Sequence, residues 1–319
     1  MYNIPILLLA YKRTKNIKKI LKILKKLNAT KLYVSIDGPK NNNPDFYQNK
    51  KVKEIFDNLN WNYKIKKNYL KINYGCRDAV SNGIDWFFEN EKMGIIIEDD
   101  CLPNKSFFKF CKKNLIFFRN NKKIGCITGN NFQSKKNYKT YNYDYYFSKY
   151  PHCWGWATWR RSWKLYDRNI KFWKNFKNSK SWKQYFEEKD QYRYWTKIFD
   201  NCYKNKLDSW AFPWALCLWK KNLLTVTPSV NLVKNTGFEE DATHTITKDD
   251  DMLYQNYELK NCSKKLKKIE IDKKMDDYVF NSHFKGKNYL WPYRFIYLIN
   301  YFLNSPYNFI KKIKNRIYD

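Results

Sequence analysis

The chain has 319 residues and a formal net charge of +32, from 62 Lys and Arg against 30 Asp and Glu. This length can bury a substantial core, as one large α/β domain or two smaller ones. No run reaches the ~18 apolar residues of a membrane-spanning helix, and we expect no signal peptide at the N-terminus. The Lys excess is spread along the chain, which indicates a compositional bias with solvated Lys heads. The eight Cys form no C-x-x-C pair, so we expect reduced thiols in the cytosol.

The first hundred residues alternate predicted strands with predicted helices. Apolar runs predict strands at 4–10, 31–36, 63–70 and 94–97, and helical spacing predicts helices at 15–27, near 52–59 and at 78–89. This alternation indicates a parallel sheet with right-handed crossovers. Neither a G-x-G-x-x-G fingerprint nor a P-loop motif is present, which argues against a dinucleotide-binding domain and a P-loop phosphotransferase.

The second part of the chain is rich in aromatic residues. We predict a helix at 106–118, a strand at 124–129, a mobile Tyr-rich loop at 137–150, helical structure over 167–205 and a strand at 223–228. Four Trp lie within the ten residues 154–163. Clustered Trp can fill a core or form a platform for a sugar.

Three consecutive carboxylates, those of Glu98, Asp99 and Asp100, follow a buried apolar strand. Adjacent anions repel one another and resist burial, so a cation is expected beside them. Ligands of open α/β sheets bind beyond the carboxyl ends of the strands, and a divalent cation completed by a diphosphate fits that position. The alternative is a solvated acidic turn.

The last thirty residues are distinct in composition. Residues 288–303 are aromatic and apolar, and residues 311–316 are basic. This pattern fits an interfacial helix on an anionic membrane leaflet. A C-terminal helix docked on the protein's own core fits it equally well.

Five segments recur together in the order and spacing of one family. They are Ala10-Tyr-Lys-Arg13, Asp37-Gly, Asn73-x-Gly75-x-Arg77, Glu98-Asp-Asp100 and Trp154-Gly-Trp156. The ordered set resembles the nucleotide-diphospho-sugar transferases of the GT-A fold. It is most similar to bacterial hemolytic-protein-A-like (HlpA-like) sugar transferases and, distantly, to the Golgi N-acetylglucosaminyltransferase I family.

The resemblance implies an α/β fold with a mostly parallel central sheet flanked by helices. The GT-A domain would span 1–246, with a nucleotide-binding half at about 1–130 and an acceptor half at about 131–246. Residues 247–319 would form a C-terminal helical, basic and aromatic extension.

The resemblance also implies roles around the nucleotide. Ala10, Arg13 and Asp37 would hold the uridine and ribose. Arg77 would face the nucleotide or its phosphates, although pairing with Asp78 or capping a loop is an equal alternative from chemistry alone.

The resemblance also implies a role for each residue of the acidic triplet. Asp100 would bind Mn²⁺ or Mg²⁺, Asp99 would lie beside the ribose and sugar, and Glu98 would shape the site. The metal would stabilise charge on the leaving diphosphate.

The catalytic base is expected among the later carboxylates. Relatives carry an acid just before the Trp that matches Trp214, but residues 211–213 here are Ala-Phe-Pro. Asp208 is the nearest carboxylate, and its alternative role is to cap a turn before Trp210. The rival candidates for the base lie in an acidic cluster that includes Glu239. His244 is a candidate metal ligand, and its alternative is a structural role.

The resulting hypothesis is an inverting, metal-dependent glycosyltransferase. It would move a sugar from a nucleotide-diphosphate sugar, with UDP favoured, to a glycan or lipid-linked acceptor in surface polysaccharide synthesis. Trp154, Trp156 and Trp210 would contact the acceptor. The protein would be cytoplasmic, with a peripheral contact at the inner face of the cytoplasmic membrane if the C-terminal segment is interfacial.

Two other functions compete with this hypothesis. The charge and aromatics would suit a single-stranded nucleic-acid groove, but the acidic triplet would repel phosphate and no RNA-binding motif is present. A degenerate GT-A domain that only binds or scaffolds is the other alternative, because the acid before Trp214 is missing.

Overall fold

The computed structural model describes residues 1–40, 43–237, 255–259, 266, 268–289 and 293–306. Within them the centre of the fold is an eight-stranded sheet with the order β3-β2-β1-β4-β8-β6-β9-β7. A two-stranded antiparallel sheet pairs β10 with β5. The strands are β1 (Ile6–Ala10), β2 (Leu32–Ile36), β3 (Ile65–Tyr69), β4 (Met93–Glu98), β5 (Cys101–Pro103), β6 (Ile124–Thr128), β7 (Tyr145–Ser148), β8 (Trp156–Trp159), β9 (Leu224–Pro228) and β10 (Val233–Asn235).

The main sheet is mixed but mostly parallel. β3, β2, β1 and β4 run in the same direction. β8 is antiparallel to both of its neighbours, β4 and β6, so β6 runs in the same direction as β4. β9 is parallel to β6, and β7 is antiparallel to β9 at the edge. The predicted α/β class with a mostly parallel central sheet flanked by helices is confirmed.

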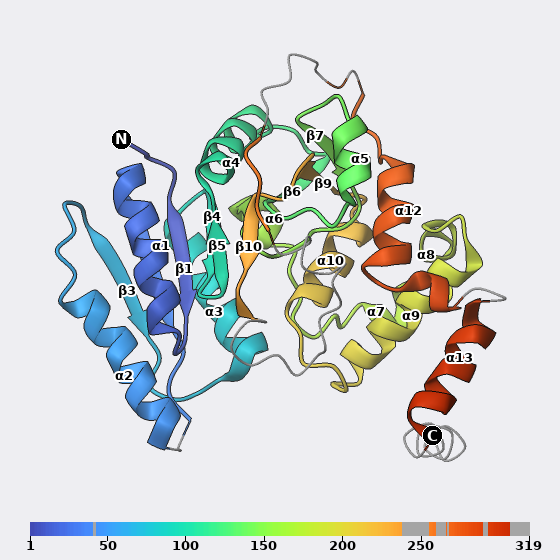
Figure 1. Cartoon of the computed structure of the whole chain (residues 1–319), viewed down its shortest axis with the longest axis horizontal. Helices are drawn as coiled ribbons and strands as arrows, with labels where there is room; N and C mark the ends of the chain where they lie inside the picture. Colours follow the sequence, from blue (N-terminus) through green and yellow to red (C-terminus); the bar gives the residue numbers. More distant parts are fainter. Residues whose placement is uncertain (41–42, 238–254, 260–265, 267, 290–292, 307–319) are drawn as a thin grey trace.

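Helices cover both faces of the sheet (Figure 1). The described helices are α1 (Thr14–Leu27), α2 (Asn43–Asp57), α3 (Gly75–Asn90), α4 (Lys105–Phe117), α5 (Lys135–Thr140), α6 (Arg160–Trp163), α7 (Trp173–Phe176), α8 (Lys180–Gln184), α9 (Lys189–Tyr203), α10 (Ala211–Lys220), α12 (Lys273–Ser282) and α13 (Tyr293–Asn304), with a 3₁₀ turn η2 (Gly286–Tyr289).

Alternation along β1 divides the core into two layers. Successive side chains of a strand point to opposite faces, so Ile6 and Leu8 pack with α1, α2 and α4, whereas Leu7 and Leu9 pack with α3, α10 and α12. The second layer is dominated by Trp and Phe. Both faces of β1 are buried, which explains its uninterrupted apolar sequence.

α1 shows how the local sequence sets an element's bounds. Ile17, Ile20, Leu21 and Leu24 recur at helical spacing and are buried, with Lys on the other face. The helix ends at Asn28, whose left-handed conformation lets its N–H bond back to the carbonyls of Leu24 and Lys25.

The structure differs from the sequence expectations in several places and adds elements for which none had been made. The Tyr-rich segment 137–150 is not a mobile loop, because it contains the end of α5 and the largely buried edge strand β7. Residues 156–159, which carry two of the clustered Trp, form β8 in the middle of the sheet. The pairing of β5 with β10 was also not expected. α3 begins three residues before the predicted start, at Gly75.

The C-terminal helices differ in how they contact the rest of the protein. α12 buries Val279 and Phe280 in the aromatic layer. α13 lies at the periphery (Figure 1), and its Phe295, Ile299 and Leu303 are exposed. No helix among the described residues is long and apolar enough to cross a membrane.

Candidate functional site

The carboxyl ends of β1, β2 and β4 meet at one edge of the sheet. Ala10 pairs with Ile36, and Leu9 pairs with Glu98, so the residues that follow these strands converge. They line a cavity of about 360 Å³, to which the start of α3 also contributes. Five residues predicted to bind the nucleotide sugar (Ala10, Arg13, Asp37, Glu98 and Asp99), together with Asp100, line this cavity, which we call the acidic cavity.

Asp99 is the most buried carboxylate of the triplet and is paired with Arg13. It is 4% exposed, and it accepts hydrogen bonds from the Tyr11 main-chain N–H at 2.9 Å and from Arg13 Nη1 at 2.7 Å. The same Arg13 nitrogen lies 3.9 Å from Asp100 Oδ2. Burial raises the pKa of Asp99 more than Arg13 lowers it. Burial lowers the pKa of Arg13, but Asp99 and Asp100 raise it further, so its net shift is upward.

Asp37 organises the loop that precedes α3. Its carboxylate accepts from the main-chain N–H groups of Gly38, Tyr74 and Gly75 and from Asn73 Nδ2, at 2.8 to 3.2 Å. A carboxylate offers about four lone-pair sites, so these four donors use its full capacity. Asp37 therefore fixes the wall of the acidic cavity, and its contact with a nucleotide stays a prediction.

Glu98 and Asp100 are partly exposed residues that line the acidic cavity. Burial, with the neighbouring Asp100 and Asp99, raises the pKa of Glu98 well above its ordinary value. Asp100 Oδ1 accepts from the Cys101 thiol at 3.2 Å.

The segment after β10 lies against Asp100. Thr236 donates from its N–H and Oγ1 to the Asp100 main-chain oxygen at 2.8 and 3.0 Å. A Cβ at Gly237 would lie 2.9 Å from Asp100 Oδ2. A side chain at position 237 would therefore push against the Asp100 carboxylate.

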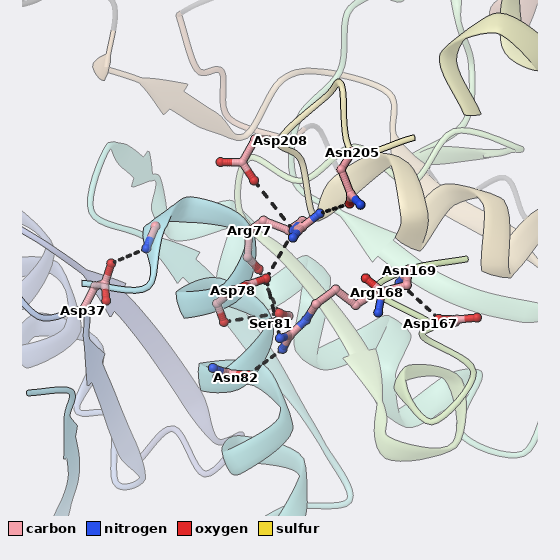
Figure 2. Close-up of polar contacts among 11 residues, drawn as sticks. Asp37, Arg77, Asp78, Ser81, Asn82, Asp167, Arg168, Asn169, Asn205 and Asp208 are labelled. Carbon is pink, nitrogen blue, oxygen red and sulfur yellow. Dashed lines mark hydrogen bonds and ion pairs between the residues drawn. The ribbon is translucent and has the colours of Figure 1, made fainter. Parts of the chain in front are cut away.

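Arg77 points away from the acidic cavity toward the connection between α9 and α10 (Figure 2). Its Nε lies 3.2 Å from Asp78 and 3.7 Å from Asp208, and its Nη1 donates to Asn205 at 2.9 Å. The pairing with Asp78 matches the alternative to a nucleotide-binding role. Arg77 thus links α3 to the α9–α10 connection.

Asp208, the candidate base, is exposed beside Arg77, with 71% of its side chain accessible. Burial, followed by the carboxylates of Glu98, Asp208, Asp100 and Asp37, raises the pKa of the Cys76 thiol to about 12. Asp208 therefore lies within electrostatic reach of the rim of the acidic cavity. The base role itself stays a prediction.

The donor set suits a hard cation only in part. Carboxylate oxygens are preferred ligands of Mg²⁺ and Mn²⁺, and Glu98 and Asp100 both line the acidic cavity. However, the described residues include no group of three His, Cys, Asp or Glu side chains placed to hold a metal. A cation here fits only if Asp100 and substrate oxygens share it. Glu239 and His244 lie outside the described residues.

The three candidate acceptor-binding Trp occupy different environments. Trp156 and Trp210 are 1% and 3% exposed and stack in the core with ring centroids 5.5 Å apart. Both match the core-filling alternative. Trp154 is partly exposed and meets Phe132 edge to face at 5.0 Å. A sugar contact therefore stays a prediction mainly for Trp154.

Sequence reasoning missed several residues of the site. Lys40 and Cys76 line the acidic cavity, and Gly237 lies against Asp100. Only Cys76 lay inside a recognised motif, Asn73-x-Gly75-x-Arg77. The others come from loops whose position depends on contacts distant in sequence.

The fold and site define an α/β protein with a carboxylate-lined cavity at the carboxyl ends of parallel strands. No protein-family model and no curated protein matches the chain. Among solved structures, it is similar to the mannosyltransferase PcManGT from Pyrobaculum calidifontis in complex with GDP-Man and Mn²⁺, with a TM-score of 0.33 and 11% identity. The match covers 50% of this chain and 46% of that one. A likeness of this size shows neither family nor activity.

Proposed function

We propose that the protein is a glycosyltransferase that moves a sugar from a nucleotide-diphosphate sugar, with UDP favoured, to a glycan or lipid-linked acceptor. The observation that carries the proposal is the acidic triplet at the end of β4, beside a cavity of about 360 Å³. In open α/β sheets this is the position at which ligands bind, and the volume falls within the range of small-molecule pockets. The acceptor would belong to surface polysaccharide synthesis.

The charges around the acidic cavity suit a diphosphate with a divalent cation. Asp100 would hold Mn²⁺ or Mg²⁺ together with diphosphate oxygens, and the cation would stabilise charge on the leaving group. Arg13 is fixed by Asp99 at 2.7 Å and keeps donors free for an anion, since a guanidinium has five N–H groups. Asp37 holds the loop that closes the opposite wall.

The transfer would invert the anomeric centre. Asp208 would take the proton of the acceptor hydroxyl while that oxygen attacks the anomeric carbon and the nucleoside diphosphate leaves. The Asp208 carboxylate lies 3.7 Å from Arg77 Nε, and its exposed side chain leaves it open to an acceptor hydroxyl.

The exposed α13 supports contact with a membrane. Phe295, Ile296, Phe302 and Leu303 are 45 to 69% exposed, and the chain has a large positive charge. An apolar helix surface on a basic protein suits the headgroup region of an anionic leaflet. We place this contact at the inner face of the cytoplasmic membrane, where lipid-linked acceptors would be reached.

Calorimetry with a panel of nucleoside diphosphates, with and without Mn²⁺, tests the proposal. We expect one diphosphate to bind only with metal, and Asp100→Ala to abolish that binding. Gly237→Ala should weaken it at least tenfold, because the new methyl displaces the Asp100 carboxylate. Asp57→Ala is the matched control, since Asp57 is an exposed carboxylate paired only with Lys67 and Tyr69 among the described residues. Metal-independent binding with full affinity in Asp100→Ala would refute the proposal.

A further inference from the structure

A second cavity, of about 170 Å³, lies at the same edge of the main sheet as the acidic cavity. It is lined by the segment after β6, the segment before β8, helices α9 and α10, and the residues that follow α12. β4 and β6 run in the same direction, so Asn130 follows the carboxyl end of β6 as Asp99 follows that of β4. We call the second one the aromatic cavity.

Asn130 presents two buried N–H donors without a partner in the aromatic cavity. It is 1% exposed, and its Oδ1 accepts from Thr128 Oγ1 at 3.0 Å and from the Trp154 main-chain N–H at 3.2 Å. A main-chain N–H can only donate, so the orientation of the amide is fixed. Nδ2 makes no hydrogen bond with the described residues. A buried donor left unpaired costs ~1–3 kcal/mol, which a suitable ligand would remove.

His152 presents a second unpaired polar atom. It is 8% exposed, and its Nε2 has no hydrogen-bond partner among the described residues. Burial, with His283 nearby, lowers the pKa of His152 well below its ordinary value, so the ring is neutral. Asn130 and His152 are therefore suited to a ligand with neutral hydrogen-bonding groups.

The walls of the aromatic cavity are aromatic rings, some of which meet edge to face and some of which stack. Phe132 contacts His152 at 4.6 Å and an interplanar angle of 84°, and Trp154 at 5.0 Å and 72°. Phe132 also stacks on His283, with ring centroids 3.6 Å apart. This contact leaves no space between the two rings for the flat base of a nucleotide. Such walls suit the apolar C–H faces of a puckered ring whose hydroxyls reach the buried polar groups.

We propose that the aromatic cavity binds one neutral sugar ring of the acceptor, held by Asn130 and His152 against the rings of Phe132 and Trp154. This inference rests on the proposed function, because it assigns the acceptor side of the same site. The volume is far above the ~10–15 Å³ that one water needs. No Asp, Glu, Lys or Arg among the described residues lines the cavity, so these residues offer no counter-charge to a charged sugar.

Binding of methyl glycosides without nucleotide or metal tests the inference. The probes are the methyl α- and β-glycosides of glucose, galactose, mannose and N-acetylglucosamine. Trp154, Trp195 and Trp219 line the aromatic cavity, so intrinsic fluorescence should report binding, with saturation-transfer NMR as a second readout. We expect saturable binding of at least one probe by the full chain.

Two variants and one control make the test specific. Ala211→Leu adds volume at a partly exposed position of the lining, and Asn130→Asp keeps the accepting oxygen but removes both N–H donors. Each should weaken glycoside binding at least tenfold. The control Asn131→Asp makes the same change in a neighbour whose Nδ2 donates to the Pro228 carbonyl at 2.6 Å, and it should bind glycosides like the native chain.

Two results would overturn the inference. One is that no glycoside binds, and the other is that binding survives Ala211→Leu unchanged. Metal-dependent diphosphate binding, measured on the same variants, separates this inference from the proposed function. Diphosphate binding without any glycoside binding leaves the transferase proposal standing alone. Glycoside binding without diphosphate binding supports a sugar site and rejects the transferase.

Discussion

The ion pair between Arg13 and Asp99 can be tested for its contribution to the stability of the acidic cavity. The Arg13 guanidinium pairs with Asp99 at 2.7 Å and lies 3.9 Å from Asp100. Asp99 is 4% exposed, so its charge has little access to water. Replacing Arg13 by Met keeps the length of the side chain and removes the only ion-pair partner that Asp99 has among the described residues.

The magnitude follows from the burial of the two partners. Removing one partner of a fully buried pair costs about 3–5 kcal/mol, because the other charge is left unpaired. The Arg13 side chain is 37% exposed, so solvent weakens the pair and the loss is smaller. We expect Arg13→Met to lower the free energy of unfolding by about 2–3 kcal/mol. The loss should grow with rising pH, because Asp99 then ionises without a counter-charge.

A double variant distinguishes the ion pair from simple loss of packing. Asp99→Asn removes the stranded charge, so Arg13→Met with Asp99→Asn should recover at least about 1 kcal/mol relative to Arg13→Met alone. Urea unfolding followed by fluorescence and circular dichroism measures each step. The reasoning fails if Arg13→Met is neutral, or if the double variant is no more stable than Arg13→Met. Recovered stability without recovered diphosphate binding would show that the Arg13–Asp99 pair also serves the ligand.

Two other predictions concern the C-terminal part. Burial raises the pKa of Asp276 to about 7, so the fold favours its protonated form. That stabilisation is complete below the ordinary pKa of 3.8 and is lost as the pH rises through about 7. The free energy of unfolding from urea titrations should therefore fall by up to about 4 kcal/mol between these pH values in the native chain. An equal dependence of this free energy on pH in Asp276→Asn would contradict the prediction. Deleting residues 288–319 should release the protein from vesicles of phosphatidylserine with phosphatidylcholine, measured by co-sedimentation with pure phosphatidylcholine as control. Unchanged binding would reject α13 as the anchor.

The N-terminal half of the fold was predictable because its strands and helices alternate locally. Apolar runs bounded by turns and helices at regular spacing identify β1, β2 and β4 with the helices between them. β7 and β8 were missed for a physical reason. Their Tyr, Trp and Thr residues carry polar groups that resemble loop or core-filling sequence, and only pairing with distant strands buries them. Gly155, with a φ of +64°, lies at the turn into β8. A glycine at this position made the start of the strand hard to predict from the sequence.

The acidic cavity was largely predictable, whereas the partners of its residues were not. Parallel strands bring their carboxyl ends together, so Asp37 and the triplet at 98–100 had to meet. Which donors satisfy Asp37 depends on the loop at 73–75, about 36 residues further along. The burial of Trp156 and Trp210 likewise depends on the packing of α10 against the sheet. The aromatic cavity left no sequence signal, since its polar groups become unpaired only in the folded chain.

The C-terminal extension contributes to the candidate acceptor site as well as to any membrane contact. His283 and Phe284 follow α12 and line the aromatic cavity. α12 is fixed in place by Asp276, which accepts hydrogen bonds from Ser148 Oγ at 2.5 Å and the Lys149 main-chain N–H at 3.0 Å. The nearby Lys149 cation lowers the Asp276 pKa, whereas Asp272 raises it.

Ionisation of Asp276 in its buried position would weaken the packing of α12 and, with it, one wall of the aromatic cavity. Glycoside binding should therefore weaken as the pH rises above about 7, together with the stability of the chain. Diphosphate binding at the acidic cavity does not depend on α12, because none of its lining residues comes from that helix. The C-terminal extension should thus affect ligand binding at the aromatic cavity but not at the acidic cavity.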